Sequence, residues 1–336
     1  MQPPNQTANQ HFVSQVEQRL NAHNPNAAPA NQRIYSYTVV DRESFTLSLD
    51  SQRGSKIGNN LAFRDLFSFE VIPSQALRSN LEVMFQEYEV VIRTNTLGLL
   101  QKLERGQGDV KTEILELFAA KLMNFLRNPY SIKKVLNTIG GVLHFHPTDP
   151  QILANYEAVL AGAKPHQKFL CNQLGVSPEE YKAWLAALFM TLFRPVPNEP
   201  NMMEGIIKGL FEAPSVFPMV CVYRYDRAED DKRCLISDRG YSSPIGQEDH
   251  LSFSFNLCSY AFITYVFGAI DALEPAKRAA PELVEKFKKL RKGVSVMPFI
   301  NDLNALARYN QNVVYQSHHA VYSSSTIVYG VTVQIS

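Results

Sequence analysis

The chain has 336 residues, of which 45% are hydrophobic and 19% are charged, with 33 Lys and Arg residues against 32 Asp and Glu residues. This composition excludes a wholly disordered chain and allows one large domain or two modest ones. The formal net charge of +1 excludes a global basic field of the kind that marks many nucleic-acid binders, while a local basic patch stays open.

The first 32 residues are rich in Asn, Gln, Ala and Pro and predict a partly ordered N-terminal arm. Its opening residues have neither the basic start nor the apolar run of a secretory signal. Within the arm, Phe12, Val16 and Leu20 recur every fourth residue and predict a short amphipathic helix. Residues 33–40 and 44–49 then predict a β-hairpin, because both are rich in aromatic and β-branched residues.

From about residue 73 to residue 195 the apolar residues recur with helical spacing. Ser177 is followed by a proline and two glutamates, the pattern of a helix N-cap and first turn. The helices expected in this middle region cover residues 77–92, 114–126, 149–160 and 178–192.

The C-terminal part of the chain predicts mainly strands. Residues 215–225 and 233–238 flank a charged turn and are expected to pair, and the tail from Asn312 is expected to be β. A further helix with a basic end is expected over residues 274–292. We therefore expect an α+β fold in which strands from both ends share a mostly antiparallel sheet around a helical middle. Residues 33–336 are expected to form one domain.

The segment Leu251–Ile270 carries no charge and is long enough to span a bilayer. Its first part alternates apolar and polar residues, however, which is the period of a half-buried strand. We expect a strand followed by a second buried element, and no membrane span.

The cysteines predict a reducing compartment and no metal or redox centre, because no CxxC pair occurs and two of them lie in apolar runs. This makes the cytoplasm the expected location. The chain's cysteines are Cys171, Cys221, Cys234 and Cys258.

Two groups of polar residues are candidates for chemistry. Glu82 and Glu89 lie seven residues apart on the first expected helix, two turns apart on one face, where they would serve metal binding or acid–base work or form a solvated outer face. Ser237 and Asp238 directly follow an apolar strand, a typical position for functional residues and equally for an ordinary turn.

The order of the short motifs in the chain resembles a bacterial family that carries only a domain-of-unknown-function label, number four-two-three-eight. Its members look like His-x-x-Pro-Gln at the front, a Leu-Glu…Glu helix, an Arg-x-Pro helix end and a late Ser-Asp-x-Pro turn. The chain has Ser14 where the family has Pro, and Arg239-Gly240 where it has Asn-Pro. The motifs that carry the resemblance here are HFVSQ, LEVMFQEYE, LRNP and SDRG.

The resemblance implies that one polar site is drawn from distant parts of the chain. Carried over by position, it would comprise His11, Gln15, Glu82, Glu89, Arg127, Ser237 and Asp238.

Two functions follow as hypotheses. The first is a nuclease-like hydrolase that acts on nucleic acid in bacterial defence or as a toxin. In it, Glu82, Glu89 and Asp238 would hold Mg²⁺ or His11 would be the general base, and Arg127 would stabilise a phosphate. The basic stretch Lys288–Lys292 would supply phosphate contacts or be only a solvated helix end.

The second hypothesis is a non-catalytic binding or sensor protein, in which the same polar residues form a structural network that ties the N-terminal arm to the sheet. The near-neutral charge fits a protein partner or self-association at least as well as nucleic acid.

Overall fold

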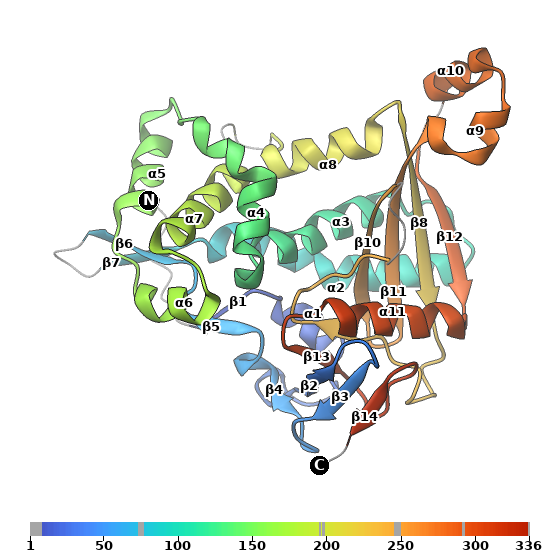
Figure 1. Cartoon of the computed structure of the whole chain (residues 1–336), viewed down its shortest axis with the longest axis horizontal. Coiled ribbons are helices and arrows are strands. Elements are labelled where there is room, and N and C mark those ends of the chain that lie inside the picture. The colour runs from blue at the N-terminus through green and yellow to red at the C-terminus, as the bar shows by residue number, and fades with distance from the viewer. Residues whose placement is uncertain are drawn as a thin grey trace.

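A computed structural model describes residues 9–72, 77–194, 196, 199–244, 250–290 and 293–334. The described chain has the expected α+β architecture, with helices between strands from the two ends (Figure 1). Figure 1 shows four helices gathered on one side of the molecule and a large sheet on the other. These helices are α4 (Ile132–Ile139), α5 (Pro150–Ala161), α6 (Gln167–Leu174) and α7 (Pro178–Leu192).

The large sheet has the strand order β10-β11-β8-β12. β11 runs antiparallel to both of its neighbours, and β12 runs parallel to β8. The charge-free segment at 251–270 forms the β10–β11 hairpin, as its alternation predicted, and no helix among the described residues is long and apolar enough to cross a membrane. The strands are β8 (Val216–Arg224), β10 (His250–Cys258), β11 (Ala261–Ala269) and β12 (Ser295–Ile300).

A second sheet joins the two ends of the chain, as predicted, in the order β14-β3-β2-β13-β9 with β4 paired to β2. The expected first hairpin is present, because β2 and β3 are antiparallel. From the other end, β13 pairs antiparallel with β2 and β14 pairs parallel with β3. The strands are β2 (Arg33–Asp41), β3 (Thr46–Leu49), β4 (Ser55–Lys56), β9 (Ile236–Ser237), β13 (Ala320–Ser323) and β14 (Thr332–Gln334).

The helical middle contains the expected helices with the expected caps. Ser177 and Glu180 form a capping box at the start of α7, and Asp149 caps α5. The helices of this region are α2 (Glu82–Glu104), α3 (Lys111–Leu126), α4 (Ile132–Ile139), α5 (Pro150–Ala161), α6 (Gln167–Leu174), α7 (Pro178–Leu192) and α8 (Met202–Glu212).

The first expected helix begins later than its apolar spacing predicts. Leu77 belongs to β7 (Leu77–Asn80), which pairs with β6 (Ser68–Ile72), and α2 starts only at Glu82. Residues 73–76 lie outside the described residues. A strand pair and a helix start can share one apolar spacing over a few residues, which is why the sequence pattern misled here.

Three expectations for the C-terminal part are wrong. Residues 312–316 close helix α11 (Leu303–Gln316), whose Asp302 cap was not recognised. The strand after the charged turn, β9, pairs with β13 of the second sheet instead of with β8. The expected helix over 274–292 is divided into α9 (Glu274–Arg278) and α10 (Pro281–Leu290), because proline starts a new helix at Pro281. Residues 291–292 lie outside the described residues.

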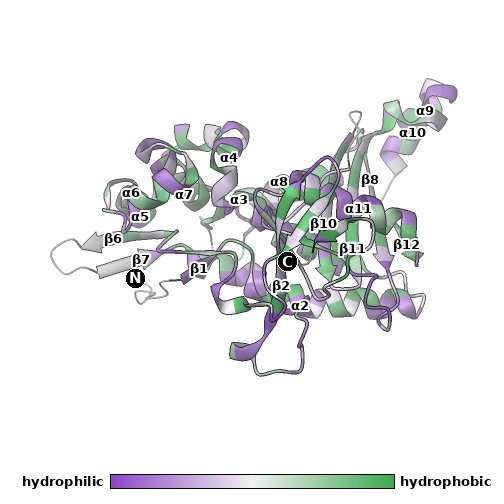
Figure 2. Cartoon of the chain, turned by 60° about the horizontal axis from the view of Figure 1, so that its bottom comes forward, coloured by the Kyte–Doolittle hydropathy of each residue, from purple (hydrophilic) through white to green (hydrophobic). Residues whose placement is uncertain are grey.

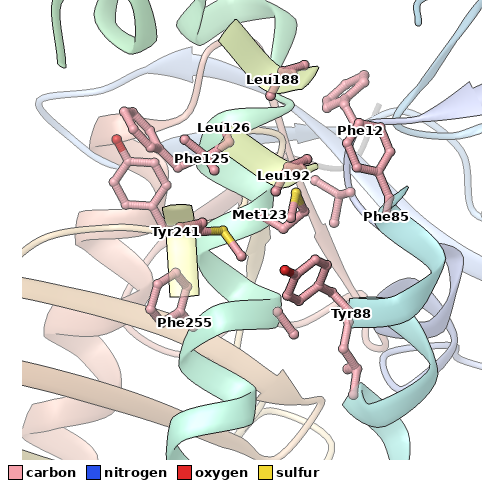
Figure 3. Close-up of a cluster of buried hydrophobic side chains, with 14 of the residues drawn as sticks. Phe12, Phe85, Tyr88, Met123, Phe125, Leu126, Leu188, Leu192, Tyr241 and Phe255 are labelled. Carbon is pink, nitrogen blue, oxygen red and sulfur yellow. The ribbon is translucent and has the colours of Figure 1, made fainter. Parts of the chain in front are cut away.

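The main core lies where α3 crosses the large sheet. The Phe118 ring lies 4.7 Å from that of Tyr265 and 6.1 Å from that of Phe255, measured between centroids. Hydrophobic residues are dense along β8 and β11 (Figure 2), and Figure 3 shows side chains of α2, α3 and α7 interdigitating around Met123. Met123, Phe125 and Leu126, near the end of α3, belong to this core, so the packing holds that end of the helix in place.

The N-terminal arm is more ordered than its composition predicts. From Asn9 it forms β1 (Asn9–His11), which pairs with β5 (Ala62–Arg64), and then α1 (Gln15–Arg19). Phe12 and Val13 lie in the main core, while polar residues beside them are buried and hydrogen-bonded. Polar side chains of the arm, such as those of Gln10 and Gln18, thus form hydrogen bonds inside the protein. Residues 1–8 lie outside the described residues.

The cysteines lie inside the protein, as predicted. All of them are buried and free. Burial raises the pKa of the Cys258 thiol to about 11, which keeps it protonated at neutral pH.

Candidate functional site

The antiparallel pair α2 and α3 brings the start of α2 close to the end of α3. Glu82 is the first residue of α2, Glu89 lies two turns further on, and Arg127 caps the end of α3. β1 adds His11 beside them, because the arm passes over this end of the helix pair. The structure therefore gathers four of the predicted site residues into one cluster, which we call the acid–base cluster: His11, Glu82, Glu89 and Arg127.

Arg127 is the buried centre of the acid–base cluster, with a side chain only 1% exposed. Its Nη1 donates to Glu89 Oε1 at 2.5 Å, and its Nη2 donates to Asn124 Oδ1 at 3.3 Å. The guanidinium carbon lies 5.3 Å from the centroid of the Phe85 ring. Its Nε has no hydrogen-bond partner among the described residues. One N–H donor of this arginine is thus buried and unused.

Glu82 is the residue of the cluster whose acidity is most altered. Burial raises the pKa of its carboxyl to about 7, while Arg127 opposes the shift and Glu89 adds to it. Its Oε1 is buried without a hydrogen-bond partner among the described residues. A carboxyl group that titrates near neutral pH can take up and release protons at physiological pH.

His11 presents a single ring nitrogen to the cluster. Arg19 donates to Gln15 Oε1 at 2.7 Å, so the amide nitrogen of Gln15 faces His11 Nδ1, 3.4 Å away. Nδ1 is therefore the acceptor, and the proton of a neutral ring lies on Nε2. Burial lowers the pKa of His11, with Arg127 acting in the same direction against the backbone at Ile57 and Gly58 and against Glu89.

Among the described residues, His11 Nε2 makes no hydrogen bond of full geometry, although the backbone of Ile57 and Gly58 lies close enough to the ring to raise its pKa. At neutral pH this ring is an uncharged N–H donor. Its expected role as a general base stays a prediction.

Asp238 does not join the cluster as a metal ligand. Its carboxylate accepts backbone N–H bonds from His318, His319 and Ala320 at 2.6 to 2.9 Å, which ties the end of β9 to the start of β13. Ser237 accepts a bond from the backbone of Arg239 in the same turn. Among the described residues no group of three or more His, Cys, Asp or Glu side chains is placed to hold a metal ion.

In the part of the chain that the structure describes, Glu82, Glu89 and Asp238 thus form no group placed to hold a metal ion, and backbone amides take up the Asp238 carboxylate.

In the basic stretch 288–292, the first lysine has local acid partners. Lys288 contacts Asp271 and Glu285 at 2.9 and 2.8 Å on the exposed helix α10. Figure 1 shows α9 and α10 projecting from one end of the large sheet, away from the acid–base cluster.

Sequence reasoning missed a second set of buried polar residues that extends the cluster. Lys121 of α3 forms an ion pair with Glu17 of α1, and both side chains are at most 5% exposed. Asn124 donates to Glu17 Oε2 at 2.8 Å and accepts from Arg127. A lysine within the apolar stripe of a predicted helix was the available signal.

The comparisons with known proteins do not show a family for this chain. No family model matches it, and no solved structure matches it, so the resemblance described above stays a prediction. A stretch of 173 residues is 25% identical to part of a protein described as extracellular matrix-binding protein ebh from Staphylococcus aureus (strain MRSA252). That match covers 48% of this chain and only 2% of the relative.

Proposed function

We propose that the chain is a nuclease-like hydrolase whose chemistry takes place at the acid–base cluster. The observation that carries the proposal is the set of unsatisfied buried atoms: the donors His11 Nε2 and Arg127 Nε and the acceptor Glu82 Oε1. A buried polar atom without a partner costs about 1–3 kcal/mol. His11 and Glu82 are both electrostatically coupled to Arg127 and Glu89, and we take the unpartnered atoms of these neighbouring residues as the place of a ligand. Two donors and one acceptor complement an anionic group beside a hydroxyl.

The cluster supplies the groups for a phosphodiester cleavage. The Glu82 carboxylate accepts a proton from the attacking water molecule, whose oxygen bonds to phosphorus while the bond to the leaving oxygen breaks. The protonated Glu82 then returns this proton to the leaving oxygen. The N–H donors of His11 and Arg127 stabilise the negative charge on the phosphoryl oxygens. Glu89 holds the guanidinium in place and, with a side chain 22% exposed, marks the side that solvent reaches.

The test is cleavage of end-labelled RNA and single-stranded DNA oligonucleotides with excess EDTA. We expect cleavage by the wild type and a loss of at least ~100-fold in Glu82→Gln, the usual contribution of a proton-transfer group. Glu87→Gln on the same helix is the matched control, because that side chain is 60% exposed. Absence of cleavage by the wild type, or equal rates in the two variants at unchanged melting temperature, would contradict the proposal.

A non-catalytic binding or sensor protein is the second candidate. The pairing of Arg127 with Glu89 favours it, because this pair neutralises the cation that would meet a phosphate. The partial relative is also named for binding, to extracellular matrix. In this reading, substitutions in the cluster alter stability alone, and the protein has no cleavage activity to lose.

A further inference from the structure

A cavity of about 360 Å³ lies between α3, α4, α8 and β10, and none of the residues of the acid–base cluster lines it. Its volume falls within the ~300–1,000 Å³ usual for small-molecule sites. Ile206 and Leu251 line it and are 53% and 49% exposed, so they mark its mouth. The walls are mainly apolar, with Phe118, Leu122, Phe125, Met203, Leu210 and Phe253 among the lining residues.

One side of this cavity is lined by the cation Lys134, and a second cation, Arg239, contacts the lining residue Tyr241 without lining the cavity itself. Lys134 Nζ lies 3.4 Å and Arg239 Nη2 lies 2.6 Å from the hydroxyl oxygen of Tyr241, which both of them approach as donors. Tyr241 is buried and lines the cavity, and its ring packs edge-on against Phe125 at 5.7 Å (Figure 3). The cavity thus joins an apolar interior to a positively charged side.

These two cations lack acidic partners. No described residue that lines the cavity is an Asp or a Glu. Neither Lys134 nor Arg239 forms an ion pair with a described acid, whereas Arg194 in the larger neighbouring cavity is paired with Glu204 at 2.6 Å. Lys134, which lines the cavity, is therefore available to an external anion.

We propose that this cavity binds a medium-length fatty acid, with the hydrocarbon chain inside and the carboxylate at Lys134. At roughly 30 Å³ for a group the size of a water molecule, about twelve such groups fill the cavity. The apolar chain is removed from water, and a charge-assisted contact from Lys134 holds the carboxylate. This site is independent of the acid–base cluster.

The experiment is calorimetric titration of the full chain with dodecanoate below its micelle concentration. We expect saturable binding of one molecule and at least ten-fold weaker binding for Lys134→Met. Lys133→Met is the matched control, because Lys133 is also exposed on α4 and does not line the cavity. Dodecanol, which lacks the charge, is expected to bind more weakly than dodecanoate.

Leu210→Trp fills the cavity and is expected to abolish binding, with its melting temperature reporting that the variant folds. If it does not fold, Ile206→Trp at the exposed mouth replaces it. The proposal is overturned if the wild type shows no saturable binding, if Lys133→Met and Lys134→Met bind equally, or if a folded cavity-filling variant binds as well as the wild type.

Discussion

The raised pKa of Glu82 makes the stability of the folded protein depend on pH. Its folded pKa of about 7 lies above its ordinary value of 4.5, so the folded protein holds a proton there that the unfolded chain has already released. The free energy of unfolding must therefore fall as pH rises from 4.5 to 7, and above 7 the whole penalty is present. For this shift the penalty is at most about 3 kcal/mol.

Glu82→Gln removes this penalty, because the amide does not ionise. We expect the unfolding free energy of the variant, relative to wild type, to increase from pH 5 to pH 8 in urea denaturation. Glu87→Gln, on the exposed face of the same helix, should show no such trend. A difference between wild type and Glu82→Gln that is constant across this range would show that Glu82 is not buried as described.

The ion pair between Lys121 and Glu17 makes a second prediction at this scale. Lys121→Met leaves the Glu17 carboxylate buried without its cation and is expected to lower the unfolding free energy by about 3–5 kcal/mol. The double variant Glu17→Gln/Lys121→Met removes both charges and should recover part of that loss. If the two single losses simply add in the double variant, the residues do not form a coupled pair.

Among the elements, the turn after β9 depends on the glycine that follows Arg239. Gly240 has a φ of +79°, and a Cβ placed there would lie 2.6 Å from the Cβ of Asn124. Asn124 joins Glu17 to Arg127, so this turn closes directly over the polar cluster. The turn needs glycine both for its backbone conformation and for this close approach.

Gly240→Ala is expected to destabilise the protein by about 2–4 kcal/mol, because it adds a clash to the strain of a positive φ. Gly175→Ala is a matched control: Gly175 has a φ of +65° with open space around it, so only about 1 kcal/mol of strain applies. Equal losses of thermal stability in both variants would contradict the close packing of the turn on α3.

The elements were predicted well where local signals are strong. The caps at Ser177 and Asp149 and the alternation in β10 depend on neighbouring residues, and the structure has them. The helix start near Leu77 and the helical end of α11 were mistaken, because short apolar stretches satisfy both periods. The pairing of β9 with β13 depends on a contact across some eighty residues, which no local pattern contains.

For the whole molecule, the shared sheet of N- and C-terminal strands was predictable, but the contents of the site were only partly so. Glu82, Glu89 and Arg127 meet because α2 and α3 run antiparallel. The spacing placed Glu82 and Glu89 on one helix face, whereas only the resemblance put Arg127 with them. The role of Asp238 was not predictable, because its amide partners come from residues 318–320. Lys121 and Asn124 were overlooked because a helix stripe does not reveal which polar residue finds a buried partner.

The central claim is that Glu82 performs proton transfer in the acid–base cluster. The most direct measurement is the rate of oligonucleotide cleavage between pH 5 and 9 in EDTA, for the wild type and for Glu82→Gln. We predict a rate that rises with pH to a plateau, with an apparent pKa near 7, because the base must be ionised. A rate that is zero at every pH, or a profile that Glu82→Gln leaves unchanged, would contradict the account.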